Sequence, residues 1–236
     1  MTEAPIHGLQ KLTLLDYPGK TACTVFFAGC NFRCPFCHNA GLVLRPQELP
    51  VIPYDTLFSY LEKRRGILDG VCITGGEPTL YPQLPELIAE IRNRGFSVKL
   101  DTNGTNPAML RELIDCGSLD YAAMDVKSSK EGYAAATGLD GISLERIEES
   151  VALLKQGRIP YEFRTTVTAE LHTPAVMEGI GKWLQGAERY FIQPFVDSGD
   201  LIGSGMTACS RQQLAALLET VRKYLPNAEL RGTDVI

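Results

Sequence analysis

The sequence predicts an α/β fold built as a partial (β/α)6 barrel that is open on one side. Three observations support this prediction: short β-rich runs alternate with helical patterns, the alternation repeats six times, and polar motifs follow the strands. Six such units imply a parallel sheet with right-handed crossovers, whereas a closed barrel needs eight. With 236 residues, of which 44% are hydrophobic, the chain is expected to form one domain over residues 1–236.

Each predicted strand is a short run rich in β-branched and aromatic residues. The strands are expected at 21–27, 71–74, 96–100, 121–126, 161–167 and 189–193. Parallel strands place their carboxyl ends at one rim, and this rim is where α/β proteins bind their ligands. Polar residues that directly follow the strands are therefore candidate site residues.

Helical patterns follow the strands and complete the repeating units. They are expected at 54–65, 83–94, 107–115, 143–156, 173–185 and 209–224, with a small helical piece around 132–136. Gly95 and Gly117 stand just past two of these helices, as helix-ending glycines do. Pro107 fits a first helical turn, and Ser143 is a good helix cap.

Composition argues against several classes of function. The net charge of −5 and the pI near 5.3 give no basic footprint, so nucleic acid is not expected as a partner. No uncharged apolar run approaches the ~18 residues of a membrane span, and residues 1–5 lack the start of a signal peptide. We therefore expect a cytoplasmic protein without membrane attachment. His7, His38 and His172 form no evident triad with a nucleophile, and each is interpreted as a solvated or locally bonded residue.

Three of the seven cysteines stand within eight residues, in the loop after the first predicted strand. Thiolates as close as those of Cys30, Cys34 and Cys37 either ligate a soft metal or oxidise. The other four cysteines are scattered singly, so no fourth ligand is apparent. The pattern predicts a four-iron cluster with three protein ligands and one iron left open to bind a substrate.

Two other interpretations of these cysteines remain open. A structural zinc ion could use His38 as its fourth ligand, although adjacent residues such as Cys37 and His38 chelate one tetrahedral ion poorly. Buried or disulfide-bonded cysteines are the second alternative. The odd number of cysteines and the lack of a secretory segment argue against it.

The spacing Cys-x3-Cys-x2-Cys, with Phe36 before the last cysteine, resembles the cluster loop of the radical S-adenosylmethionine (SAM) superfamily. The resemblance implies a barrel of the radical SAM type, a [4Fe-4S] cluster on Cys30, Cys34 and Cys37, and SAM bound at the open iron. Phe36 is then expected near the adenine, which is compatible with packing in the core. In that family the reduced cluster cleaves SAM to methionine and a 5′-deoxyadenosyl radical.

Other rim residues are candidates for binding SAM. Gly75-Gly76-Glu77-Pro78 is by itself a turn, but beside the cysteine loop it resembles the motif that meets the SAM amino group. Arg164 is expected to face the barrel interior, where a charge needs a partner or a ligand. The cofactor-binding candidates are Phe36, Gly75, Gly76, Glu77, Asp101, Thr102, Asn103, Lys127, Arg164 and Gln193.

Resemblance to the glycyl-radical-enzyme activases implies a monovalent-cation site that touches SAM, with Asp101, Thr102, Met124 and Asp125 as its ligands. Lys127 is expected on the carboxylate or ribose side of SAM. From chemistry alone, 101–104 is also good turn material, and Asp125 with Lys127 is also a simple ion pair.

Two stretches, 12–20 and 24–31, resemble the activating proteins of anaerobic ribonucleoside-triphosphate reductase. Pyruvate formate-lyase activases usually carry Asp-Gly-Pro-Gly at the position of 16–19 and Leu-Pro-Tyr-His near Gln193, and this chain has neither. Only Cys72 occurs in 38–74, so one cluster is expected.

The resemblance thus implies an enzyme that generates a glycyl radical on a partner enzyme, with an electron donor such as flavodoxin or ferredoxin. A pyruvate formate-lyase-type activase, a radical SAM enzyme acting on a small molecule, and a non-enzymatic iron-sulfur module are the alternatives.

Overall fold

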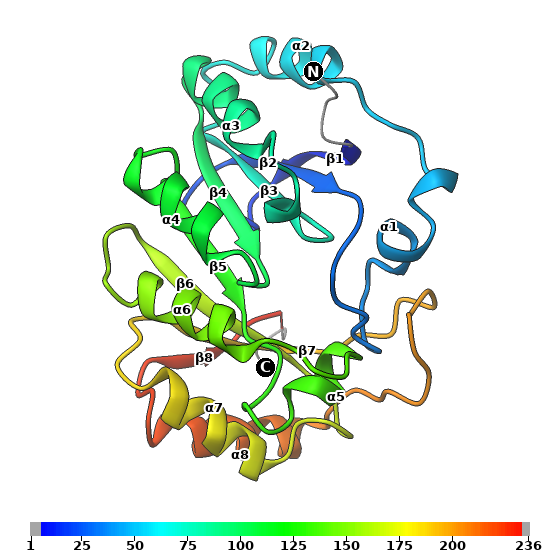
Figure 1. Cartoon of the computed structure of the whole chain (residues 1–236), viewed down its shortest axis with the longest axis vertical. Helices are drawn as coiled ribbons and strands as arrows, with labels where there is room; N and C mark the ends of the chain where they lie inside the picture. The colour runs from blue at the N-terminus through cyan, green and yellow to red at the C-terminus, as the bar shows by residue number, and fades with distance from the viewer. Residues whose placement is uncertain (1–5, 233–236) are drawn as a thin grey trace.

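The computed structural model describes residues 6–232, and it confirms an α/β fold with an open, mostly parallel sheet. Residues 1–5, where no signal peptide is expected, lie outside the described residues. One sheet carries the eight described strands in the order β1 to β8 along the chain. β1 and β8 form its two edges, so the barrel is not closed (Figure 1).

The six predicted strands are β2 to β7, and the structure adds one strand at each edge. The strands are β1 (Ile6–Thr13), β2 (Ala22–Phe27), β3 (Gly70–Gly75), β4 (Ser97–Thr102), β5 (Tyr121–Asp125), β6 (Tyr161–Val167), β7 (Tyr190–Pro194) and β8 (Ala228–Leu230). β2 to β8 are parallel, whereas β1 pairs antiparallel with β2. The sequence does not predict the edge strands, because β1 buries only its two end residues and β8 is three residues long.

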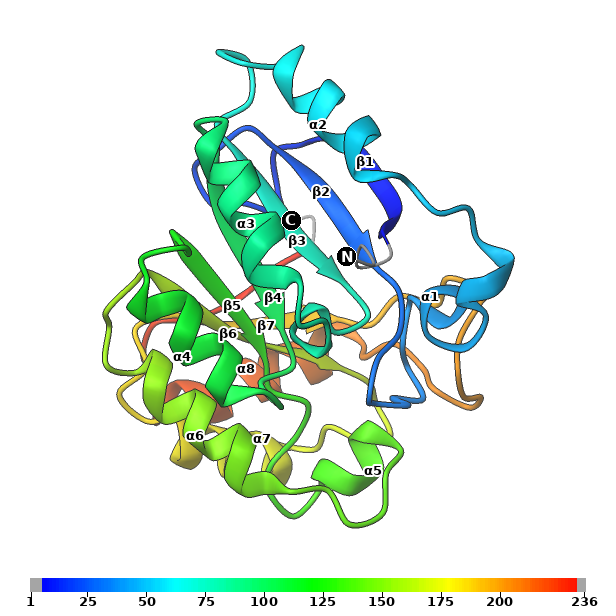
Figure 2. The same cartoon turned by 45° about the horizontal axis from the view of Figure 1, so that its top comes forward.

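Helices cover the outer face of the sheet and leave its concave face to the loops (Figures 1 and 2). The six long helices confirm the predicted ones: α2 (Tyr54–Glu62), α3 (Leu84–Asn93), α4 (Pro107–Asp115), α6 (Leu144–Leu154), α7 (Pro174–Leu184) and α8 (Arg211–Arg222). The small helical piece is α5 (Tyr133–Thr137). Short elements that the sequence does not predict are α1 (Ala40–Leu44) and the 3-10 turns η1 (Pro46–Glu48) and η2 (Pro78–Leu80).

The apolar spacing within the helices explains the core. α3 buries Leu84, Leu87, Ile88 and Ile91, which lie on one face because the helix repeats every 3.6 residues. Side chains of this kind pack against the sheet in one continuous hydrophobic cluster. Ser143 occupies the N-cap of α6, but it makes no side-chain cap hydrogen bond.

The stretch 12–20 closes the end of the barrel opposite the strand carboxyl ends. The Tyr17 side chain is 2% exposed, and its ring lies 6.1 Å from the ring of Tyr121, at the start of β5. The Thr24 hydroxyl donates a hydrogen bond to Asp16 Oδ2 at 2.5 Å. Leu15 is 85% exposed. The structure therefore gives this stretch a role in the fold, at a distance from the rim motifs.

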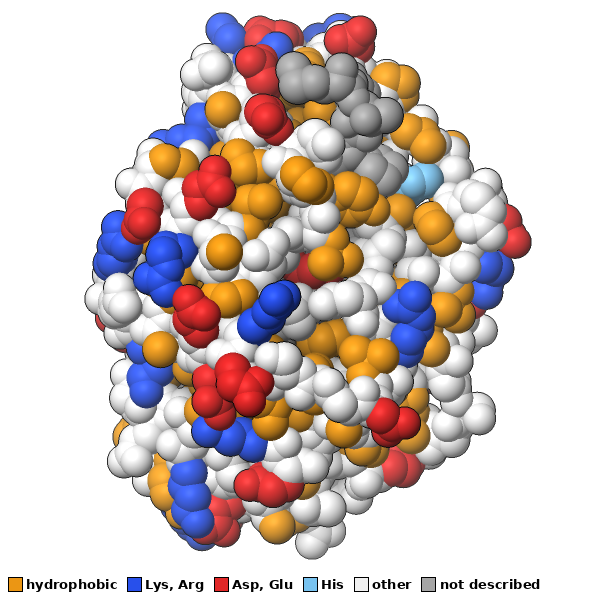
Figure 3. Space-filling model, in the orientation of Figure 1, with side chains coloured by type: hydrophobic (Ala, Val, Ile, Leu, Met, Phe, Trp, Pro, Cys, Tyr) orange, Lys and Arg blue, Asp and Glu red, His pale blue; other side chains and the backbone are white. Residues whose placement is uncertain are grey.

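The surface carries charges of both signs. Figure 3 shows Lys and Arg side chains interspersed with Asp and Glu on the visible face, without a continuous basic surface. No helix within residues 6–232 has the length and apolar composition that a membrane span requires.

Candidate functional site

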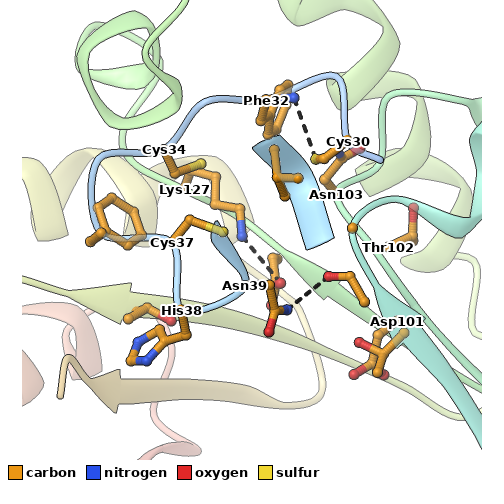
Figure 4. Close-up of a pocket in the computed structure, with 17 residues that line it drawn as sticks. Cys30, Phe32, Cys34, Cys37, His38, Asn39, Asp101, Thr102, Asn103 and Lys127 are labelled. Atoms are coloured by element: carbon orange, nitrogen blue, oxygen red, sulfur yellow. Dashed lines mark hydrogen bonds and ion pairs between the residues drawn. The ribbon is translucent and has the colours of Figure 1, made fainter. Parts of the chain in front are cut away.

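A cavity of about 160 Å³ lies at the carboxyl ends of the central strands. Loops that follow β2, β3, β4 and β5 supply most of its walls (Figure 4). The lining confirms that motifs far apart in the sequence share one rim. It includes Cys30, Phe36, Gly75, Asp101, Asn103 and Lys127.

The thiols of Cys30, Cys34 and Cys37 line this cavity, and Figure 4 shows them spaced around it. Within residues 6–232, no three His, Cys, Asp or Glu side chains are grouped to hold a single metal ion. A multi-iron cluster needs a different thiolate for each protein-bound iron, so separated thiols suit it. The donor set therefore fits an iron-sulfur cluster with three protein ligands.

The electrostatic surroundings of the thiols bear on how the cluster is loaded. Burial raises the pKa of the Cys34 thiol to about 12 and that of the Cys30 thiol to about 11. The Cys30 sulfur also accepts a hydrogen bond from the Phe32 N–H at 3.3 Å, which favours its thiolate form. Because iron binds thiolates, loading the cluster must release protons from these thiols.

The cysteine loop is held against the loop that follows β3. The Glu77 N–H donates to the Gly29 carbonyl at 2.8 Å, and the Gly76 N–H donates to the Phe27 carbonyl at 2.9 Å. In a third hydrogen bond the donor is on the side of the cysteine loop: Asn39 Nδ2 donates to the Gly75 carbonyl at 2.9 Å. The two loops therefore form one unit, and a displacement of either would move the thiols.

Gly75 and Gly76 are required by this close approach. Gly75 has φ +117°, and a Cβ there would lie 2.3 Å from the Phe27 carbonyl oxygen. A Cβ on Gly76 would lie 1.7 Å from the Gly29 carbonyl oxygen. Both glycines line the cavity, and a contact between their backbone and SAM stays a prediction.

Glu77 is fully buried and does not line the cavity, contrary to the predicted contact with SAM. Its Oε1 accepts hydrogen bonds from the Thr79 N–H at 3.1 Å and the Thr102 hydroxyl at 2.7 Å, and Oε2 accepts one from the Asn103 N–H at 2.6 Å. Burial raises the pKa of Glu77, and these donors act in the opposite direction. The carboxylate ties the loop after β3 to the loop after β4, which makes it a positioning residue.

We expect Glu77→Gln to lower the free energy of unfolding by about 1–3 kcal/mol in urea titrations, because the amide nitrogen would leave a buried donor unpaired. The exposed Glu112 on α4 provides a control, and Glu112→Gln should change this free energy by less than about 0.5 kcal/mol. If the two variants were equally stable, Glu77 would not have the positioning role.

Lys127 brings a positive charge into the cavity, as the sequence predicts (Figure 4). Its Nζ lies 3.1 Å from Asp125 Oδ2. Burial opposes the charge on Lys127, but neighbouring Asp125 holds its pKa above the usual value. An ammonium that stays charged beside the thiols can bind the carboxylate of a ligand.

Three further candidates lie outside the cavity wall. Arg164 is not part of the cavity wall, and its guanidinium lies between Asp101 and Asp125. Met124 is fully buried. Gln193 is on β7, in register with Thr166, which does line the cavity. A direct contact between Gln193 and SAM stays a prediction.

His172 is a residue whose importance the sequence does not reveal. It is buried, not solvated: its Nδ1 accepts a hydrogen bond from the Thr168 N–H, so Nε2 carries the proton and donates to the Lys127 carbonyl, both at 3.0 Å. Its ring also lies edge-on to Phe36, with centroids 6.0 Å apart. His172 thus supports both Lys127 and Phe36. His38, in contrast to His172, is exposed, and it lies at the edge of the cavity.

Comparison with known proteins gives a family match that covers more than half of the chain. The family model described as the Radical SAM superfamily matches residues 24–170. These residues include the cysteine loop and the strands that surround the cavity.

Two relatives and one solved structure are similar to this chain, each over a different share of its length. A candidate glycyl-radical enzyme activating enzyme of Methanocaldococcus jannaschii is 30% identical over 97% of this chain and 96% of its own length. The pyruvate formate-lyase-activating enzyme of Clostridium pasteurianum is 29% identical over 58% of this chain and 59% of its own. The crystal structure of Streptococcus suis SuiB bound to S-adenosylmethionine has a TM-score of 0.68 at 15% identity, over 87% of this chain and 49% of that one.

Proposed function

Because the chain belongs to the radical SAM superfamily, we propose that it generates a glycyl radical on a partner enzyme, the anaerobic ribonucleoside-triphosphate reductase. Its cofactors are those of the superfamily, a [4Fe-4S] cluster and SAM. The observation that carries the activating function is the similarity over nearly the whole chain to a candidate glycyl-radical enzyme activating enzyme, whose partner is not named.

When bound, the cluster and SAM supply the radical chemistry that removes a hydrogen atom from a glycine Cα of the partner. The chain itself binds and orients them. Cys30, Cys34 and Cys37 would hold the cluster. Lys127 would bind the SAM carboxylate, and the backbone of Gly75 and Gly76 would face its amino group.

The open sheet supports a protein as the substrate. A closed eight-stranded barrel fills its interior with side chains, whereas this sheet is open between its edge strands β1 and β8. A peptide loop that carries the target glycine can therefore approach the cavity from the side. A small-molecule substrate needs no such access, and it remains the alternative that the experiment below excludes or supports.

The choice of the reductase as partner rests on the resemblance of 12–20 and 24–31 to the reductase-activating proteins. Asp16 and Tyr17 of the first stretch contribute to the fold at the opposite end of the barrel, so this support comes from sequence similarity and not from contact with a partner. Flavodoxin or ferredoxin would supply the electron.

The test is to reconstitute the protein without oxygen, reduce it, and incubate it with SAM and the anaerobic reductase from the same organism. We expect an electron paramagnetic resonance (EPR) signal of a glycine-centred radical, together with 5′-deoxyadenosine in proportion to that radical. A reductase whose target glycine is replaced by alanine is the matched control, and it should give no such radical.

Two other results would refute parts of the proposal. If pyruvate formate-lyase acquired the radical and the reductase did not, the partner assignment would be wrong. Turnover of a small molecule without any protein partner, and no radical on either enzyme, would refute the activating function itself.

A further inference from the structure

The guanidinium of Arg164 occupies the space between two carboxylates below the cavity. Its Nη1 lies 3.1 Å from Asp101 Oδ2, and its Nε lies 2.9 Å from Asp125 Oδ1. The Arg164 side chain is only 11% exposed. One buried cation thus bridges the carboxyl ends of β4 and β5, where a monovalent cation is expected from the sequence.

Each of the two carboxylates also has a second positive partner. Lys99 forms an ion pair with Asp101, and Lys127 Nζ lies 3.1 Å from Asp125 Oδ2. Burial alone would raise the pKa of both aspartates, but these cations together with Arg164 hold both pKa values below the usual range. A third carboxylate is also near, because Arg164 Nη1 lies 4.0 Å from Oε1 of the fully buried Glu162, which pairs in turn with Arg231. Arg164 and the two lysines thus supply the positive charge that balances Asp101 and Asp125.

Thr102 lines the cavity, but its hydroxyl and the Met124 side chain have neighbours other than Arg164. Alternate residues of a strand point to opposite faces, and Thr102 and Met124 are adjacent in register on β4 and β5. The Thr102 hydroxyl donates to Glu77, and the end of the Met124 side chain lies 2.1 Å from where a Cβ on Gly104 would be. The side chains of Asp101, Thr102, Met124 and Asp125 are thus not directed at one common position, and Arg164 lies between the two carboxylates.

We propose that the Arg164 guanidinium is a built-in counter-cation that takes the place of a monovalent metal ion beside SAM, so that SAM binding requires neither potassium nor sodium. Arg164 acts as a positioning residue: it orients Asp101 and Asp125, and Asp125 in turn orients Lys127 in the cavity. The inference rests on SAM as the cofactor of the proposed function, but it does not depend on which partner is activated.

The experiment measures SAM affinity and not radical formation, so its failure is distinguishable from failure of the proposed function. The dissociation constant of SAM is obtained anaerobically on the reconstituted protein, by titrating the SAM-induced change in the EPR spectrum of the reduced cluster. It is compared in potassium chloride, sodium chloride and choline chloride at equal ionic strength. Equal ionic strength makes the screening of charges by salt the same in all three solutions. We therefore expect the dissociation constants of SAM for the wild-type protein to agree within about twofold.

Arg164→Ala removes the counter-cation and leaves the two carboxylates facing a space. In choline chloride we expect it to bind SAM about tenfold more weakly, since one partner of a buried ion pair is missing. Potassium or added guanidinium should restore most of that loss by occupying the space. Arg164→Lys keeps the charge and should stay independent of added cations. The matched control is Arg111→Ala, which removes an exposed guanidinium paired with Glu149 and should behave as wild type.

Each contrary result would overturn the inference. A wild-type protein that binds SAM much more tightly in potassium or sodium than in choline would show that a metal ion is needed. A second contrary result is a folded Arg164→Ala variant that binds SAM with unchanged affinity, and a third is a loss of affinity that neither potassium nor guanidinium reverses. Either result would show that the Arg164 guanidinium does not act as a counter-cation in SAM binding. If Arg164→Ala does not fold, as circular dichroism would reveal, cation dependence of Arg164→Lys overturns the inference.

Discussion

Replacing Cys34 by alanine is expected to abolish SAM cleavage while leaving the fold largely intact. Cys34 is one of three thiols at the cavity, and each protein-bound iron of the cluster takes its own thiolate. Anaerobic reconstitution should therefore give little bound iron, and 5′-deoxyadenosine should stay at the background of protein without a cluster. Loss of the buried sulfur should lower the free energy of unfolding of the cluster-free protein by only about 1 kcal/mol.

Cys116→Ala is the matched control for this experiment. Cys116 is exposed after α4, and its sulfur contacts Ser118 and the Leu113 carbonyl, not the cavity. This variant should keep wild-type iron content and SAM cleavage. If Cys34→Ala retained cleavage, its assignment as a cluster ligand would be wrong.

Gly76→Ala is expected to have the second largest effect, although it adds a single methyl group. The new Cβ would lie 1.7 Å from the Gly29 carbonyl oxygen, and Gly29 directly precedes the first cluster ligand. The backbone must move, which should cost about 1–3 kcal/mol of stability. Displacement of the cluster loop by about 1 Å should also reduce SAM cleavage about 100-fold. Urea unfolding of the cluster-free protein and a 5′-deoxyadenosine assay measure the two effects separately.

Gly41→Ala tests whether the loss comes from this particular contact. Gly41 lies in α1, close to the cysteine loop in sequence, and a Cβ there would be 3.6 Å from Asp200 Oδ2, an ordinary contact. We expect this control to keep both stability and activity. Wild-type activity in Gly76→Ala would show that the two loops can separate without disturbing the cluster.

The cysteine loop and the six central strands can be predicted from the sequence because their signals are local. The spacing of Cys30, Cys34 and Cys37 is contained in one loop, and each central strand is a short run rich in β-branched, aromatic and aliphatic residues that is bounded by turns. The edge strand β1 lacks such a signal. Its exposed residues are compatible with a loop, and only pairing with β2 makes it a strand.

The roles of individual polar residues are harder to predict because their partners are distant in the sequence. Glu77 is interpreted as a ligand contact from its motif, but its hydrogen bonds to Thr102 and Asn103 span 25 and 26 residues. Arg164 is correctly expected to need a partner, yet its partner Asp101 is 63 residues away. His172 gives no local signal at all, because its bond to the Lys127 carbonyl exists only in the folded chain.

Three cysteines are expected to hold an iron cluster with one iron left for SAM. Mössbauer spectroscopy of protein reconstituted with 57Fe, recorded with and without SAM under anaerobic conditions, tests it most directly. We expect the spectrum of a [4Fe-4S] cluster in which SAM changes the parameters of a single iron site. Bound zinc in place of iron, or a cluster whose iron sites are all unaffected by SAM, would contradict it.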